Sequence, residues 1–284
     1  MRKIETLWML WPAVITALAL PAYAVDGIVL INQNAALAGN VTPGDAPGFP
    51  VTISVPGSYK LSGNLAVPDA NTTAIQVNAD DVSIDLNGFA IVGKTVCTGF
   101  PATSCSPSGQ GVGINSQNTN VTVINGTVRG MGGVGIVLLG GHSRIERVQA
   151  ISNGSTGLVA NPIFPVATGD SIITSCIATQ NGNVGIGVAG LGANNVSNGN
   201  FEGMELIRQG VAINNTLNSN TRDGISGAGT FIGNTAFFNA GPGIVAGCPS
   251  TLGSNAAGFN GGLADIVLGN DLSTCARANN TPAP

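Results

Sequence analysis

The chain has 284 residues and a net charge of −4; only 8% of its residues are charged, 43% are apolar, and 42 are glycine. Nucleic-acid binding requires a basic surface, and disorder is typical of chains with low hydrophobicity and high net charge, so this composition argues against both. The apolar fraction is sufficient for a core, and the frequent Gly and Asn indicate many turns.

Residues 1–24 have the features of a signal peptide. Arg2 and Lys3 provide a positive start, residues 7–20 form an apolar run, and Ala22-Tyr23-Ala24 is a small-x-small cleavage site. An uncleaved membrane anchor is the alternative, but the run is short for a bilayer span. We therefore expect export to the extracellular space, the cell surface or a periplasm. The mature chain is expected to begin at Val25 and to have no further membrane span.

The cysteines predict two disulfides. Cys97 and Cys105 lie close together in a loop rich in Pro, Ser and Gly, and Cys248 and Cys275 bracket the last segment. Pairing by proximity gives Cys97–Cys105 and Cys248–Cys275, which fits an oxidising compartment. Cys176 falls among apolar positions and is expected to be a free, buried thiol.

A repeat runs through most of the chain. Glycine followed by Ile or Leu recurs with gaps of 22, 22, 28, 39 and 19 residues, at Gly113, Gly135, Gly157, Gly185, Gly224 and Gly243. An asparagine stands four residues before the glycine in four of these coils, at Asn153, Asn181, Asn220 and Asn239. Repetition on this length scale is typical of solenoids, in which each coil buries its apolar face against its neighbours.

Aligning the coils on these asparagines produces apolar columns. One column contains Ile145, Ile173, Ala212 and Phe231, and another contains Ala150, Ala178, Leu217 and Ala236. Stacked short strands would turn such columns into a continuous core, while the asparagines bond along the stack. The sequence thus predicts an all-β, right-handed parallel β-helix over residues 73–284. Residues 25–72 are expected to supply an N-terminal cap and the first strands, because an open end exposes the core. The Cys248–Cys275 region would close the other end, and an ordinary β-sandwich is the alternative.

Two segments resemble the opening coils of exported bacterial β-helix proteins: Pro56-Gly57-Ser58-Tyr59-Lys60-Leu61 and Asp81-Val82-Ser83-Ile84-Asp85-Leu86-Asn87-Gly88. Together with the repeat over residues 73–270, they resemble the pectin-lyase-like superfamily of parallel β-helices. This resemblance implies the fold and a polysaccharide or cell-surface glycan as partner. For a lyase, it further implies Ca²⁺ and an arginine or lysine base. No catalytic motif of the superfamily matches residue by residue.

Two turns are expected to be oversized, at about residues 160–171 and 189–209, and to project from one side as a binding face. The scarce charged residues gather there and just beyond. Glu202, Glu205, Arg208 and Asp223 are candidate catalytic residues, and Asp170 and Arg222 are candidate substrate-binding residues. Alternatively, Glu205 and Arg208 form a surface ion pair on a helical turn, and Asp223 is a turn residue.

Two other charged groups are weaker candidates, Asp80, Asp81 and Asp85 in one strand region and His142 near Arg144, Glu146 and Arg147. The sequence has no His/Cys cluster suited to zinc. Two functions stay open at this point. One is a protein that binds or acts on a polysaccharide along the side of the solenoid, as a lyase, epimerase or glycoside hydrolase if it is an enzyme. The other is a non-catalytic structural, surface or adhesion module.

Overall fold

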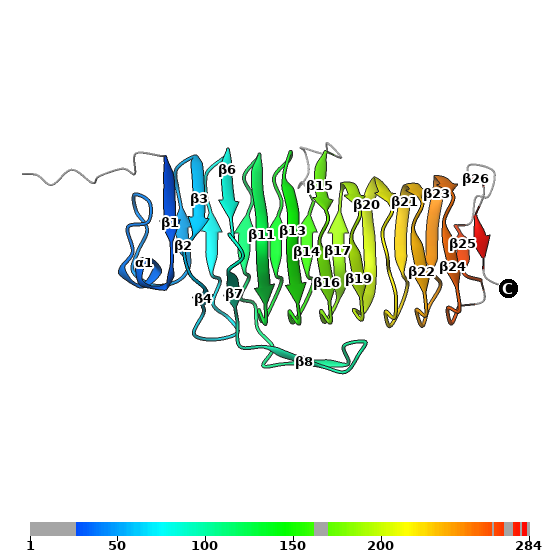
Figure 1. Ribbon diagram of the computed structural model, residues 1–284, viewed down its shortest axis with the longest axis horizontal. Coiled ribbons are helices and arrows are strands. Elements are labelled where there is room, and N and C mark those ends of the chain that lie inside the picture. Colours follow the sequence, from blue (N-terminus) through cyan, green and yellow to red (C-terminus); the bar gives the residue numbers. More distant parts are fainter. Residues whose placement is uncertain (1–26, 162–169, 263, 270–274, 279, 283–284) are drawn as a thin grey trace, which may run out of the picture.

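The computed structural model describes residues 27–161, 170–262, 264–269, 275–278 and 280–282. These residues form a right-handed parallel β-helix of about 10 turns, whose long axis is horizontal in Figure 1, so the predicted fold class is confirmed. The predicted signal peptide, residues 1–24, lies outside the described residues. Within the described part of the chain, no helix is long and apolar enough to cross a membrane.

Each coil passes through three strand columns, which we call A, B and C in chain order. Column A contains β2 (Val51–Ile53), β5 (Ile75–Val77), β10 (Ile114–Ser116), β12 (Ile136–Leu138), β14 (Leu158–Ala160), β17 (Val184–Val188), the starts of β20 (Glu202–Ile213), β21 (Ile225–Ile232) and β23 (Ile244–Gly253), and β25 (Ile266–Leu268).

Column B contains β1 (Ile28–Ile31), β3 (Gly57–Leu61), β6 (Val82–Asp85), the starts of β11 (Val121–Arg129) and β13 (Arg144–Ile151), β15 (Ser171–Thr174), β18 (Gly190–Ala193), the ends of β20, β21 and β23, and β26 (Cys275–Ala278). Column C contains β4 (Leu65–Ala66), β7 (Ala90–Val92), the ends of β11 and β13, β16 (Ile177–Thr179), β19 (Val196–Asn198), β22 (Thr235–Phe237), β24 (Ala256–Gly258) and β27 (Thr281–Pro282).

The core consists of like residues stacked in register. In column A, Ile114 pairs with Ile136, which pairs with Leu158, and all three side chains are fully buried. Burying one such side chain contributes about 1.5–3 kcal/mol. The apolar columns predicted from the repeat are therefore the inner faces of the three strand columns. Cys176 is a free and buried thiol in this core, as expected.

The predicted oversized turn at residues 189–209 is wrong, because this segment completes a coil of its own. It contains β18, β19 and the column A start of β20, where Met204 pairs with Ile186 on one side and Ile225 on the other. Two departures from the repeat conceal this coil in the sequence. Its column A residue is Met instead of Ile or Leu, and Asn200 stands three residues before Gly203 instead of four. In the other predicted turn, residues 162–169 lie outside the described residues.

The asparagine column is a hydrogen-bonded ladder at the corner between columns C and A. Each Oδ1 accepts hydrogen bonds from the backbone and side-chain nitrogens of the preceding asparagine, with Asn200 between Asn181 and Asn220. We call this the second ladder, because another ladder lies at the preceding corner of each coil. It contains Asn153, Asn181, Asn200, Asn220, Asn239 and Asn260. It ends on Asp265, whose Oδ1 accepts from Nδ2 of Asn260 at 2.9 Å and from the Asn260 backbone nitrogen at 3.2 Å.

A first ladder with the same geometry lies at the corner between columns B and C. It contains Asn195, Asn215, Asn234, Asn255 and Asn280. A left-handed bend is made at these corners by the residue before a ladder asparagine. In the second ladder these residues form a stacked row with φ between 52° and 68°. Together with Gly130, which precedes Met131 at the same position of the preceding coil, we call them the corner row: Gly130, Ser152, Gln180, Gly199, Ser219, Phe238 and Phe259.

The N-terminal end of the solenoid is covered, as predicted. At the N-terminal end, helix α1 (Gln33–Ala38) begins at Asn32, whose side chain accepts a hydrogen bond from the Ala35 backbone, and it buries Ala36 against the core. At the other end, the predicted disulfide Cys248–Cys275 joins β23 to β26.

The second predicted disulfide, Cys97–Cys105, closes an antiparallel hairpin formed by β8 (Val96–Thr98) and β9 (Ser104–Ser106). We call residues 95–107 the arm. In Figure 1 the arm lies beneath the coils and runs lengthwise along the solenoid instead of winding with it. The sequence predicted the disulfide, but it did not predict that the hairpin lies across neighbouring coils.

Candidate functional site

A cluster of charged side chains lies where two successive coils enter column A. Glu202 and Asp223 occupy equivalent positions directly before the glycine of their coils, and the Gly203 backbone N–H donates to the Asp223 carbonyl oxygen at 3.1 Å. The Arg222 guanidinium joins them, with Nε 2.8 Å from Asp223 Oδ2 and Nη2 3.2 Å from Glu202 Oε2. The Ser226 hydroxyl also donates to Glu202 Oε1. The structure therefore brings together three of the predicted site residues.

The cluster is buried on its carboxylate side and open on its arginine side. The Glu202 side chain is 4% exposed, whereas that of Arg222 is 51% exposed and its guanidinium carbon lies 5.9 Å from the centre of the Phe201 ring. Burial raises the pKa of Glu202; Ser226 and Arg222 oppose this shift. A carboxyl group with a raised pKa keeps its proton to higher pH, a property that acid catalysis uses.

The other predicted site residues lie at varying distances from this cluster. Glu205 is exposed on the outer face of column A, opposite Ser226 in the next coil, and its charge contributes to the raised pKa of Glu202. Arg208 is exposed at a register shift in strand β20, where its φ is 66°, so the expected helical turn with Glu205 is wrong. Asp170 lies elsewhere, where its carboxylate pairs with Nε2 of His142 at 2.9 Å.

The weaker candidate groups are held within networks on column B. Asp85 pairs with Lys60 at 3.7 Å and accepts a hydrogen bond from Asn125, whose own side chain accepts one from Arg147. Glu146 pairs with both Arg144 and Arg147. Among the described residues, no three His, Cys, Asp or Glu side chains gather closely enough to hold a metal ion.

Sequence reasoning missed a row of exposed aromatic rings on the same corner. The rings of Phe238 and Phe259 stack with centres 5.5 Å apart and planes 8° apart, and Phe237 lies 6.2 Å from each of them. The exposed fractions are 63% for Phe238 and 65% for Phe259. The available signal was the position of each Phe directly before a ladder asparagine, where the other coils have Gly, Ser or Gln.

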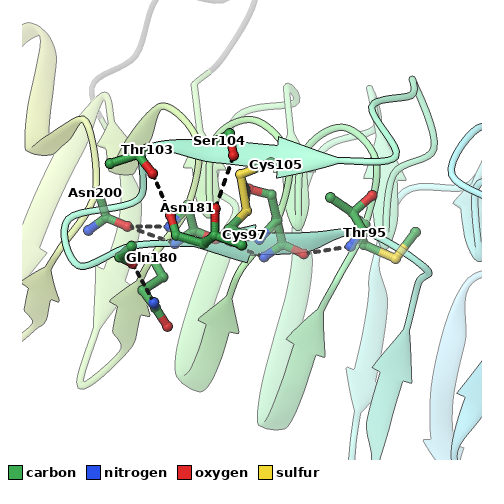
Figure 2. Close-up of a disulfide and its surroundings, with 12 residues drawn as sticks. Thr95, Cys97, Thr103, Ser104, Cys105, Gln180, Asn181 and Asn200 are labelled. Carbon is green, nitrogen blue, oxygen red and sulfur yellow. Dashed lines mark hydrogen bonds between the residues drawn. A yellow bond between two sulfur atoms is a disulfide. The ribbon is translucent and has the colours of Figure 1, made fainter.

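The arm lies against this corner (Figure 2), and its residue Phe100 adds a further ring there. Gln180 Nε2 donates to the Gly99 carbonyl at 2.7 Å, and the Ala102 N–H donates to the Gly199 carbonyl at 2.9 Å. Phe100, at the tip of the arm, is 60% exposed and packs so closely on Gly199 that a side chain there would clash with the ring. Exposed rings thus occur along the corner from the arm to Phe259.

Comparisons with known proteins support the fold. No protein-family model matches the sequence, and no curated protein matches it significantly. Among solved structures, the chain is similar to the A-module of mannuronan C-5 epimerase AlgE4 from Azotobacter vinelandii, with a TM-score of 0.61 and 16% identity over 90% of this chain and 77% of that one. The A-module of mannuronan C-5 epimerase AlgE6 from the same organism gives 0.59 and 15% over 83% and 74%. By fold, the chain is a parallel β-helix similar to these two A-modules.

Proposed function

We propose that the protein is an exported β-helix that binds a polysaccharide lengthwise along the corner between columns C and A. The observation that carries this proposal is the stack of Phe238 and Phe259 on the corner row. Both rings are largely exposed, and both residues have a positive φ, of 58° and 55°. A bulky residue in this conformation costs about 1–3 kcal/mol, and such strain is found mainly at functional sites.

The chemistry of this corner suits a sugar chain. Aromatic faces cover the C–H faces of sugar rings, while carboxylates and a half-exposed guanidinium bind hydroxyl groups. Arg222 and Phe201 lie on the same corner, on coils that precede the phenylalanine stack. The two structural neighbours are named for their action on mannuronan, which supports a glycan as the ligand. The disulfides support export.

An enzymatic form of this proposal assigns the chemistry to the charged cluster. Glu202 is then the proton donor, because its pKa is raised, and the exposed Glu205 is the second carboxylate. Asp223 holds Arg222 in place, and Arg208, three residues after Glu205 in the chain, is the additional cation. The non-catalytic form keeps the same binding surface and leaves the cluster a structural role.

Binding is tested with the chain from Val25 onward and a panel of neutral and acidic oligosaccharides, by calorimetry. The double variant Phe238→Asn/Phe259→Asn removes both rings, and asparagine accepts a positive φ. We expect affinity to fall by about tenfold or more, as for a central aromatic contact. Ile232→Asn is the control, because Ile232 is a 41%-exposed apolar residue on column B. Wild-type affinity in the double variant refutes the proposed surface.

Catalysis is tested by following the same glycans over time. New absorbance from unsaturated sugars indicates a lyase, new reducing ends without it indicate a hydrolase, and a changed uronate composition indicates an epimerase. Loss of the product in Glu202→Gln with intact binding supports Glu202 as the proton donor. Binding without any product supports the non-catalytic form.

A further inference from the structure

Two basic residues lack the carboxylate partner that other cations in this protein have. Lys60, Arg144, Arg147 and Arg222 each form an ion pair. Within the described residues, Lys94 and Arg129 pair with no carboxylate, although both side chains are exposed and the chain is acidic overall. Both line the same hollow of about 250 Å³ at the base of the arm.

The fold fixes these two residues next to each other. Arg129 ends β11, and its carbonyl oxygen accepts from the Gly93 N–H of the preceding coil at 2.8 Å, which places Lys94 one residue away. The wall of the hollow is the first part of the arm. There the Thr95 backbone donates to the Gly130 carbonyl and its hydroxyl donates to the Pro107 carbonyl at 2.7 Å.

The lining combines this charge with an apolar surface. Val92, Val96 and Ile151 complete the hollow, and none of the residues that line it is acidic. Two neighbouring cations without a counter-ion repel each other, and a bound anion relieves this repulsion. The volume is below the range of about 300–1,000 Å³ that is typical of drug-sized ligands, and it suits a single sugar unit.

We propose that this hollow binds a negatively charged sugar unit, through a carboxylate or a sulfate ester held by Lys94 and Arg129. The inference rests on the proposed function and names its substrate class, an acidic glycan. Gly130 and Ser152 belong to both the hollow and the corner row. A glycan chain that occupies the hollow can therefore continue along the corner, beside the arm, toward the phenylalanine stack. The charged cluster suits a hydroxyl-rich unit better, since two carboxylates already pair with its single guanidinium.

The test compares three sets of oligosaccharides of equal length: uronate oligomers, sulfated oligomers with a neutral backbone, and neutral oligomers. Lys94→Gln, Arg129→Gln and the double variant remove the positive charges of the hollow. Lys60→Gln is the matched control, because it changes the net charge by the same amount as either single variant, at a residue on column B already paired with Asp85. We expect each single variant to weaken acidic-oligomer binding by at least about fivefold, as for loss of a charge-assisted hydrogen bond, and the control to bind like wild type.

The outcomes separate this inference from the proposed function. Acidic-oligomer affinity that falls with added salt and with loss of Lys94 or Arg129 supports the hollow. Preference for the uronate or the sulfated set then identifies the anionic group. A protein that binds neutral oligomers only, or a double variant that binds acidic oligomers like wild type, refutes the hollow but leaves the proposed function standing. A wild-type protein that binds no oligomer refutes both.

Discussion

The second ladder predicts a large stability loss from a single side-chain truncation, Asn181→Ala. The Asn181 side chain is fully buried and takes part in four hydrogen bonds. Its Oδ1 accepts from the backbone and side-chain nitrogens of Asn153 at 3.1 and 3.0 Å. Its Nδ2 donates to the Ala150 carbonyl at 3.1 Å and to Oδ1 of Asn200 at 3.0 Å. Truncation removes all four and leaves their partners buried.

The expected cost follows from these contacts. A net contribution of about 1 kcal/mol per hydrogen bond, with a further penalty for buried groups left unpaired, gives about 3–5 kcal/mol. This is a large share of the 5–15 kcal/mol typical of a folded domain. Asn181→Asp keeps the shape but places a carboxylate oxygen against the Ala150 carbonyl and Asn200 Oδ1. We expect it to be at least as destabilising at neutral pH, and less so as the pH falls and the carboxyl regains a proton.

The assay is guanidinium unfolding followed by far-UV circular dichroism, because both tryptophans, Trp8 and Trp11, fall within the predicted signal peptide. Asn183→Ala is the control, two residues along the same turn, where the side chain is exposed and has no hydrogen-bond partner among the described residues. It is expected to change the free energy of unfolding by less than about 0.5 kcal/mol. Equal effects of Asn181→Ala and Asn183→Ala would show that the ladder does not stabilise the coils.

Three further predictions concern groups outside the ladders. Burial raises the pKa of Glu202 above 4.5, so the folded chain holds this proton more tightly than the unfolded chain does. Wild type should therefore lose stability relative to Glu202→Gln as the pH rises through the raised pKa. A difference in melting temperature between the two proteins that does not depend on pH contradicts this. Burial raises the pKa of Cys176 to about 11, so iodoacetamide at pH about 8 should label it only after unfolding, and rapid labelling of the native protein is the contrary result. In the double variant Cys248→Ser/Cys275→Ser, the free energy of unfolding should fall by about 3 kcal/mol, and a protease should cleave the last coil first. First cleavage elsewhere would contradict the role of this disulfide.

The sequence predicted the parts of the fold in which residues of the same type stack on one another from coil to coil. Glycine-Ile pairs and asparagines at fixed offsets located column A and most of the second ladder, because both are repeated in every coil that follows the pattern. The coil of Met204 was missed because its turn is one residue shorter. Unbranched Met fills the same buried position as Ile. Once that coil is counted, the apparent binding loop at residues 189–209 disappears.

The candidate site was predictable only in part, for a different physical reason. Arg222 and Asp223 are adjacent in sequence, and their partner Glu202 lies one coil away, so the repeat brings them together. The arm depends on contacts far apart in the sequence, such as that between Gly99 and Gln180, which are 81 residues apart. No local pattern encodes such a contact. The phenylalanines of the corner row break a backbone preference, which a propensity argument cannot anticipate.

The end of the second ladder has a consequence for the addition of a further coil. Each asparagine accepts from the coil before it and donates to the coil after it, so the ladder has a direction. Asp265 accepts from Asn260, but a carboxylate has no N–H to pass on. The side-chain relay therefore stops at β25, the last column A strand among the described residues. A side-chain amide at this corner would offer an N–H to a further coil, as an unpaired strand edge does, and the exchange of a nitrogen for an oxygen at Asp265 removes that donor.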